Sequence, residues 1–312
     1  MKLTPNPNDK RKLFRQLMTA PQLMVLPGVF DGYSTRLVEQ AGFRAAFITG
    51  SGISEAVMGW ADLGIMGYRE NLDACRHMAA CTEMALMGDA DTGYGNAVNV
   101  HFTVRGFEDA GLAGVMIEDQ VWPKRCGHMK GKEVISLAEA SEKIRAAAEA
   151  RRDPDFVIKS RTDTLATHGI DEVIKRLNHY AEAGADLLFA DALLSRDDRS
   201  TGARNLPKPL CVNMGFGIRK RSTTPLVSPQ ELQDLGVAVA IYPRLLTSCA
   251  IQGMKNGLAV LKDSMSTGSV IERPDLAVSF EELNSLVGFD EVQAIERRFL
   301  TPDQVRQKYG NV

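Results

Sequence analysis

The chain has 312 residues, 44% of them hydrophobic, so it is long enough to bury a large core in one α/β barrel or in two smaller domains. Lys and Arg total 37 against 39 Asp and Glu, and a net charge of -2 excludes the strong field that attracts nucleic acid or an anionic membrane. We therefore expect a small molecule as the partner.

The N-terminal segment is polar and lacks the apolar run of a signal peptide. Its residues 9–18, DKRKLFRQLM, predict a helix. No later stretch carries the roughly 18 apolar residues of a membrane span. The five cysteines have neither disulfide nor zinc spacing and predict reduced thiols. We expect a cytoplasmic protein, with an organelle as the alternative location.

Eight short apolar runs, each closed by a polar or glycine-rich turn, predict strands. They span residues 23–31, 44–50, 83–91, 112–119, 156–163, 185–192, 209–215 and 237–243. Helical periodicity follows at residues 34–42, 99–111, 136–152, 171–184 and 228–236. Strands that alternate with helices in this number predict a (β/α)8 TIM barrel of the α/β class.

No linker rich in Ser, Gly or Pro interrupts this alternation, so we expect one domain over residues 1–312 with a C-terminal helical tail over about 265–312. The alternative is an open doubly wound sheet, but no G-x-G-x-x-G turn follows the first strand. The sequence TGSGIS at residues 49–54 follows the second strand instead, and we interpret it as a strand-end loop.

Acidic residues gather where the predicted strands end, which is where a barrel carries its catalytic groups. Asp89 and Asp91 are two residues apart, so both side chains point to one face and can hold a divalent cation directly or through water. With Asp62 and Glu118 nearby, this oxygen-rich set predicts Mg²⁺, or alternatively Mn²⁺. An isolated D-x-D pair is more often a capped loop, but acidic residues at several strand ends favour the metal site.

Cys126 lies in the unusual segment KRCGHMKGK, residues 124–132. A structural cysteine behaves as a small apolar side chain, whereas a cysteine used in chemistry benefits from cationic neighbours that favour the thiolate. Cys126 therefore becomes a candidate for chemistry. The other interpretations are an exposed loop cysteine in a basic turn and, for His128, a hydrogen-bonded loop residue.

Four segments, GDADTGYGNAVNV, IEDQVWPKRCGHMKGKEV, SRTD and NMGFG followed by TTPL, resemble the isocitrate lyase and phosphoenolpyruvate mutase superfamily. The likeness is greatest to its short lyases, which act on 2-methylisocitrate, dimethylmalate and similar 2-hydroxy diacids, and to its oxaloacetate hydrolases. It covers about residues 24–262. Phosphonomutases of the superfamily lack the cysteine motif, so its presence favours cleavage of a carbon–carbon bond.

The resemblance implies that Asp89 and Asp91 bind Mg²⁺, with Asp62 and Glu118 in the surrounding network of water. The ion would hold the substrate's 2-oxygen and the adjacent carboxylate and stabilise the charge that develops there. Other residues match the family's carboxylate-binding loop and active-site arginine: Thr49, Gly50, Ser51 and Arg161.

Cleavage between C2 and C3 leaves a carbanion beside the second carboxylate, and the resemblance implies that Cys126 protonates it as a general acid. Gly127 and Gly131 would let the segment close over the substrate as a lid. Three cations would supply positive charge near the carbanion: Lys124, His128 and Arg161.

Three positions depart from the family pattern. Thr49 stands where relatives often have Ser, and Asp191 stands where many have Glu; one methylene fewer moves a carboxylate by about 1.5 Å and alters the distal end of the pocket. Lys159 shares the interior side of its strand with Arg161 and would contact an extra carboxylate, unless a bulge turns it outward. Asn213 closes the seventh strand and is a further expected substrate contact.

We therefore predict a Mg²⁺-dependent lyase that cleaves a 2-hydroxy di- or tricarboxylate into a 2-oxo acid, such as pyruvate or glyoxylate, and a carboxylate. The alternatives are an oxaloacetate-type hydrolase that yields oxalate and acetate, a phosphonomutase, and a barrel that binds a metabolite without catalysis. The base for the 2-hydroxyl proton stays open among metal-bound water, Asp62 and Glu118. The resemblance also implies a homotetramer that exchanges C-terminal helices.

Overall fold

The computed structural model of the protein describes residues 6–126, 131–193, 195–220 and 225–310. The described residues form two compact units, divided between Cys249 and Ala250. The predicted single domain, with a tail from about residue 265, stays a prediction.

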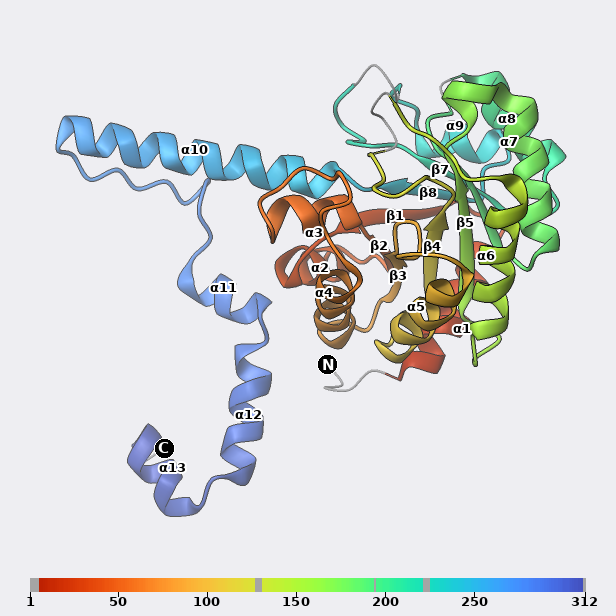
Figure 1. The fold of residues 1–312 in the computed structure, drawn as a ribbon. Coiled ribbons are helices and arrows are strands. Elements are labelled where there is room, and N and C mark those ends of the chain that lie inside the picture. The colour runs from red at the N-terminus through yellow and green to blue at the C-terminus, as the bar shows by residue number, and fades with distance from the viewer. Residues whose placement is uncertain (1–5, 127–130, 194, 221–224, 311–312) are drawn as a thin grey trace. The chain divides into compact units, whose positions relative to one another are not determined.

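Eight parallel strands close into a barrel in the order β1-β2-β3-β4-β5-β6-β7-β8 (Figure 1). Their bounds are β1 Met24–Val29, β2 Ala45–Ile48, β3 Ala85–Asp89, β4 Gly114–Glu118, β5 Val157–Thr162, β6 Leu187–Ala190, β7 Leu210–Asn213 and β8 Val239–Tyr242. Each strand lies inside one of the predicted apolar runs, because strands buried on both faces are almost continuously hydrophobic. The predicted TIM barrel is confirmed.

Helices follow the strands and cover their outer faces (Figure 1). They are α2 Gly32–Gln40, α3 Gly50–Ala56, α4 Tyr68–Ala80, α5 Ala97–Asp109, α6 Leu137–Ala150, α7 Leu165–Glu182, α8 Arg196–Asn205 and α9 Pro229–Asp234. The five predicted helical stretches all hold helices. The strand-end loop expected at residues 49–54 is wrong, because the Thr49 hydroxyl accepts the Gly52 N–H and caps the short helix α3.

The helix α1 (Pro7–Met18) closes the amino end of the barrel and confirms the predicted N-terminal helix. Phe14 and Met18 belong to the same interior apolar cluster as Leu26 of β1. The buried Lys10 ammonium donates to two backbone carbonyls at and just beyond the end of α4, at 2.9 and 2.6 Å. Because this end is filled by side chains, the polar site lies at the opposite, carboxyl end of the strands.

The helix α10 (Leu245–Thr267) begins in the first unit, and the second unit continues with α11 (Phe280–Leu286), α12 (Phe289–Phe299) and α13 (Pro302–Tyr309). Large apolar side chains are exposed along α10, α11 and α12: Ile251, Met254, Leu258, Leu261, Met265, Phe280, Phe289, Val292 and Phe299. None of the helices in the described ranges combines the length and the apolar character needed to cross a bilayer.

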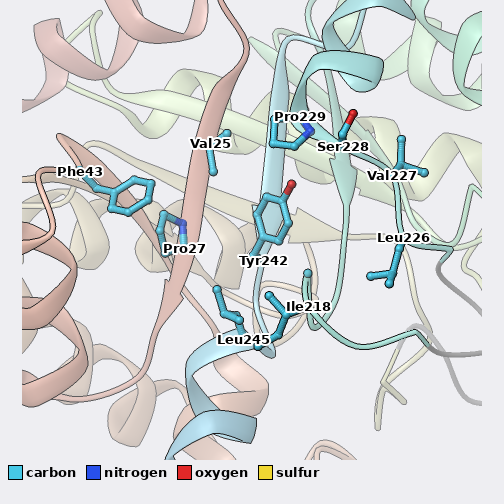
Figure 2. Close-up of a pocket in the computed structure, with 11 residues that line it drawn as sticks. Val25, Pro27, Phe43, Ile218, Leu226, Val227, Ser228, Pro229, Tyr242 and Leu245 are labelled. Atoms are coloured by element: carbon cyan, nitrogen blue, oxygen red, sulfur yellow. The ribbon is translucent and has the colours of Figure 1, made fainter.

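A groove of about 420 Å³ lies on the outer face of β1 and β8 (Figure 2). Val25 and Pro27 come from β1, and Tyr242 comes from β8. Strand neighbours such as Leu26 and Ile241 face the barrel interior instead. The described lining of this groove is mostly apolar and includes none of the predicted site residues. The groove is therefore not the predicted site.

Candidate active site

A small cavity at the carboxyl ends of the strands gathers most of the predicted site residues. Its lining includes the predicted residues Thr49, Ser51, Asp62, Asp89, Lys124, Cys126, Arg161, Asp191 and Asn213. It also includes Phe47, Met116, Ile241, Pro243 and Arg244. Gly50, Asp91, Glu118 and Lys159 lie around it as described below, while Gly127 and His128 lie outside the described residues.

The acidic face of the cavity begins where β3 ends. The Asp89 carboxylate accepts the Asp91 N–H at 3.1 Å on Oδ1 and the Gly50 N–H at 3.3 Å on Oδ2. Asp91 has a φ of 49°, a left-handed conformation that is costly for a residue with a side chain. Such strained positions cluster at functional sites, because the surrounding contacts hold the side chain in a required direction.

Lys124 bridges two of the carboxylates. Its Nζ lies 2.5 Å from Asp62 Oδ1 and 2.7 Å from Asp91 Oδ1, and all three side chains are buried. Burial raises the pKa of Asp91, and the nearby Asp89 and Asp62 raise it further, while Lys124 opposes the rise. Burial likewise raises the pKa of Glu118. One ammonium therefore does not compensate this group of acids.

The arrangement fits a hard divalent cation. Among the described residues, Asp91 Oδ2 and Glu118 Oε1 are buried without a hydrogen-bond donor. Within the same part of the chain, no three Asp, Glu, His or Cys side chains form a ready set of direct ligands. An ion held by Asp89 and Asp91, with Asp62 and Glu118 around it, would complete its coordination with water and substrate oxygens, as Mg²⁺ usually does.

Arg161 is fixed at the end of β5. Its guanidinium donates to both oxygens of Asp163 at 2.8 and 2.9 Å, and it also lies 3.2 Å from Glu118 Oε2 and 3.7 Å from Asp191 Oδ2. The Lys132 ammonium donates to Asp163 at 2.9 Å. Burial opposes ionisation of Asp163, but Arg161 and Lys132 outweigh it and lower the pKa of that carboxyl. Arg161 is thus held rigid and charged in the cavity wall.

The neighbouring part of the wall carries Asp191 and Asn213, from the ends of β6 and β7. The Asn213 amide donates to Asp191 Oδ1 at 3.3 Å, and its oxygen accepts the Gly215 N–H at 2.8 Å. Thr49 and Ser51 lie with their hydroxyl oxygens 2.9 Å apart. The Thr49 and Ser51 hydroxyls and the Asn213 amide can donate to carboxylate oxygens of a ligand.

The segment that carries Cys126 is anchored at its base. The Gln120 side chain donates to the Arg125 carbonyl and accepts the Arg125 N–H, both at 2.9 Å. Gln120 also forms an antiparallel bridge with Val134. The Cys126 Sγ reaches the cavity, where it lies 3.7 Å from an Nη2 of Arg244. The thiol and a guanidinium therefore meet at the cavity wall.

Lys159 lies inside the barrel, beneath the cavity, with none of its surface exposed. Its Nζ lies 4.7 Å from the ring centroid of Phe47 and 4.3 Å from that of Phe189. β5 pairs in register with both neighbours through Lys159, so the outward bulge does not occur. Burial lowers the pKa of Lys159, although Cys211 opposes this. Its contact with a substrate stays a prediction, because Phe47 lines the cavity and Lys159 does not.

Sequence reasoning assigned no role to several residues at or around this site: Glu55, Lys132, Asp163 and Arg244. Asp163 follows Arg161 by two residues, so strand alternation was a usable signal for it. Arg244 comes one residue after the apolar run that ends in Pro243, and its ion pair with Glu55 spans 189 positions. Nothing local in the sequence indicates such a partner.

Residues 14–262 match a family model described as phosphoenolpyruvate phosphomutase. The chain belongs to the phosphoenolpyruvate mutase and isocitrate lyase superfamily. This superfamily member is 36% identical to 2,3-dimethylmalate lyase of Eubacterium barkeri, over 92% of this chain and 97% of that one. It is 35% identical to a probable 2-methylisocitrate lyase of Corynebacterium glutamicum, over 95% and 94% of the two chains. The predicted superfamily is confirmed, and the protein is an enzyme of the carbon–carbon lyase type.

Solved structures of the superfamily share the whole fold. A 2,3-dimethylmalate lyase structure matches with a TM-score of 0.87 and 30% identity, over 98% of this chain and 99% of that chain. An oxaloacetate acetylhydrolase bound to 3,3-difluorooxalacetate matches with a TM-score of 0.86 and 30% identity, over 93% and 97%. A phosphonopyruvate hydrolase with oxalate and Mg²⁺ matches with a TM-score of 0.82 and 27% identity, over 94% and 99%.

Proposed function

We propose that this enzyme is a Mg²⁺-dependent lyase that cleaves the C2–C3 bond of a 2-hydroxy di- or tricarboxylate and releases a 2-oxo acid and a carboxylate. One observation carries the proposal: the Cys126 thiol, the Arg161 guanidinium and the Asp62 and Asp89 carboxylates line one cavity. A proton donor, an anion-binding cation and an acidic cluster are what this reaction requires.

Asp89 and Asp91 would hold Mg²⁺, with Asp62 and Glu118 in the surrounding water network. The presence of Mg²⁺ with oxalate in the related phosphonopyruvate hydrolase structure supports this assignment. When bound, the ion would supply electrostatic stabilisation of negative charge on the substrate's 2-oxygen. The buried oxygens of Asp91 and Glu118 that accept no hydrogen bond support the same site independently of any relative.

The protein's own groups would bind and orient the substrate. The Thr49 and Ser51 hydroxyls and the Gly50 backbone would hold the carboxylate beside C2, and Arg161 would contact it with a fixed guanidinium. Asp191 and Asn213 would contact the distal end of the substrate. Lys124 would neutralise part of the acidic cluster, so the substrate's anionic groups could enter it.

The proposed reaction breaks the C2–C3 bond and moves one proton to C3. The 2-hydroxyl loses its proton, a carbonyl forms at C2, and the electron pair of the C2–C3 bond passes to C3 and into its carboxylate. The Cys126 Sγ–H delivers a proton to C3, and the resulting thiolate regains a proton from water before the next turnover. The base that takes the hydroxyl proton stays open among metal-bound water, Asp62 and Glu118.

A panel of substrates tests the proposal: 2-methylisocitrate, isocitrate, 2,3-dimethylmalate, citramalate and oxaloacetate, each with Mg²⁺ and with chelator. We expect a 2-oxo acid from at least one 2-hydroxy acid with Mg²⁺ and none with chelator. If no compound is cleaved, the lyase proposal is wrong. Binding without cleavage would favour the alternative of a metabolite-binding barrel. Phosphonopyruvate, tested beside the panel, addresses the remaining alternative, and its turnover would favour a phosphonomutase.

A second candidate is a hydrolase that converts oxaloacetate into oxalate and acetate. The likeness to the oxaloacetate acetylhydrolase structures supports it. Detection of oxalate and acetate from oxaloacetate, with no product from the 2-hydroxy acids, would favour this reaction over the lyase.

The predicted homotetramer and the cytoplasmic location also stay predictions. The exposed apolar side chains of α10 to α12 support an assembly, since large apolar patches on a free surface usually mark interaction sites. Light scattering of the purified protein measures the number of chains.

A further inference from the structure

Asn71 is a fully buried polar side chain of α4 and has no part in the reaction proposed above. Its amide nitrogen donates to the Asp89 carbonyl and to the Tyr94 hydroxyl, both at 2.6 Å. Its amide oxygen accepts the Cys75 thiol, one turn further along α4, at 3.5 Å. A carbonyl can only accept, so the nitrogen of the amide must be the atom that faces Asp89. Asn71 therefore holds two points of the segment in which β3 ends.

The segment between these two points, residues 89–94, carries both carboxylates that we assign to Mg²⁺. The pairing of β2 with β3 stops one residue before Asp89. Further on, Asp91 and Tyr94 have φ of 49° and 60°, in the left-handed region that residues with side chains rarely adopt. A backbone in this conformation persists only where contacts with its surroundings outweigh the strain. Asn71 supplies such contacts at both ends of the segment.

Other contacts hold this segment at one point each. The Thr103 hydroxyl of α5 donates to the Gly93 carbonyl at 3.2 Å. The Glu118 N–H donates to the Asp91 carbonyl at 2.8 Å. Asn71 differs from both, because a single amide group joins the start of the segment to its end.

We propose that Asn71 is a positioning residue for the divalent ion, because it fixes the direction in which the Asp89 and Asp91 carboxylates point. This inference rests on the metal assignment within the proposed function. A carboxylate already directed at the ion loses less conformational freedom on binding, so the contacts of Asn71 increase the affinity. Mg²⁺ demands near-ideal octahedral geometry and is therefore sensitive to the direction of its ligands. Groups that orient metal ligands from behind typically contribute about 10- to 100-fold to affinity.

Calorimetric titration of the metal-free protein with Mn²⁺ alone tests the assignment without turnover, since Mn²⁺ takes the same octahedral oxygen coordination as Mg²⁺. Asn71→Leu keeps the approximate shape of the side chain and removes the amide, and Tyr94→Phe removes only a hydroxyl. Met78→Ala is the matched control, because it loosens the same helix two turns away, in the apolar core. Circular dichroism checks that each variant folds, and urea unfolding without metal measures its stability.

We expect Asn71→Leu to weaken Mn²⁺ binding by about 10- to 100-fold, because the two carboxylates are no longer directed at one point. Tyr94→Phe should weaken it by about two- to fivefold, since the contact with the Asp89 carbonyl remains. The double variant should bind about as weakly as Asn71→Leu, because both changes remove the same hydrogen bond. Met78→Ala should be less stable than the wild type and still bind Mn²⁺ within about twofold of it.

Turnover separates positioning from a general loss of structure. For the panel compound cleaved fastest, the Mg²⁺ concentration that gives half the maximal rate should rise in Asn71→Leu by the same factor as the Mn²⁺ dissociation constant. The kcat at saturating Mg²⁺ should stay within about fivefold of the wild type, since a bound ion draws both carboxylates back into place. A fall in kcat with an unchanged half-saturating concentration would indicate a structural role instead and would count against the assignment.

Unchanged Mn²⁺ affinity in Asn71→Leu would overturn the assignment. An equal loss in Met78→Ala would do so as well, because the affinity would then follow the stability of α4. If Asn71→Leu does not fold, Tyr94→Phe decides, and wild-type affinity in that variant counts against the role of Asn71. Failure of the lyase proposal is separate, because it appears as a wild type that cleaves no panel compound while Mn²⁺ binding still depends on Asn71. A wild type that binds no Mn²⁺ would overturn the metal assignment and this inference together.

Discussion

The Lys159 ammonium lies 4.3 Å from the ring centroid of Phe189, and the Arg161 guanidinium lies 5.5 Å from the same centroid. One aromatic ring therefore contacts a cation of the site and a cation of the barrel interior. Cation–π contacts are worth about 2 kcal/mol each when desolvated, whereas burial of an ammonium costs several kcal/mol. On these magnitudes burial has the larger effect, and it lowers the pKa of Lys159.

Replacement of Lys159 by Met should therefore raise the free energy of unfolding at pH 7, by about 1 to 4 kcal/mol. The folded pKa lies below the usual value of 10.5, so the unfolded chain binds more protons between these two values, and wild-type stability rises with pH across that window. Lys159→Met should lack this rise. Urea unfolding at pH 7 and pH 9 measures both effects. Met87→Leu is the control, because Met87 belongs to the interior apolar cluster that holds Phe47 and Phe189. A Lys159→Met variant less stable than the wild type would contradict the prediction.

Cys126→Ser should lower kcat by about 10² to 10⁴, because a hydroxyl is a much weaker general acid than a thiol. Oxalate binding with Mg²⁺ should stay within about threefold, since the change removes no carboxylate contact. Steady-state kinetics and calorimetry give the two values. The exposed Cys249 provides the control, and Cys249→Ser should be fully active. A fully active Cys126→Ser would remove the thiol from the proton transfer.

Mg²⁺ should raise the melting temperature of the protein, and EDTA should reverse this, because an ion that binds only the folded state stabilises it. Asp91→Asn should melt higher than the wild type without metal, since it relieves repulsion among buried carboxylates, but its response to Mg²⁺ should be much smaller. Thermal unfolding monitored by fluorescence checks both. Asp234→Asn, at an exposed position of α9, should respond like the wild type. An equal response of Asp91→Asn would place the ion elsewhere.

Asp163→Asn should destabilise the fold by about 3 to 5 kcal/mol, because Arg161 and Lys132 lose the carboxylate that compensates both of them. The pKa of Asp163 is lowered in the folded state, so its contribution is complete above the usual 3.8 and is lost only as the pH falls through the lower folded value. The deficit of the variant should therefore be constant between pH 6 and pH 8. Urea unfolding in that range, with the exposed Asp197→Asn as control, tests this.

The barrel strands could be predicted from local sequence, because each strand lies in a buried apolar run that a polar or glycine-rich turn follows. Parity along those runs also places Asp89 and Arg161 correctly at the cavity. Parity fails where the backbone leaves the strand: Thr49 begins a helix instead of a loop, because a hydroxyl cap offsets the weak helix propensity of the glycines that follow.

Long-range pairs are the part of the site that the sequence does not reveal. The ion pair of Lys124 with Asp62 joins residues 62 positions apart, and that of Arg244 with Glu55 joins residues 189 apart. Each depends on how segments that follow different strands meet above the barrel, which neither periodicity nor motif spacing encodes. The stacking of Lys159 on Phe47 and Phe189 is of the same kind, since the three side chains come from β5, β2 and β6.

The close approach of Gly50 to Asp89 leaves no room for a side chain at position 50 unless Asp89 moves. A methyl group at position 50 would stand 3.1 Å from Asp89 Oδ2 and 3.2 Å from its carboxyl carbon, tighter than ordinary van der Waals contact. The carboxylate would have to shift by a few tenths of an ångström. The absence of a side chain at Gly50 thus leaves Asp89 the room it needs to stay in its present position, where it borders the space available to an ion and its ligands.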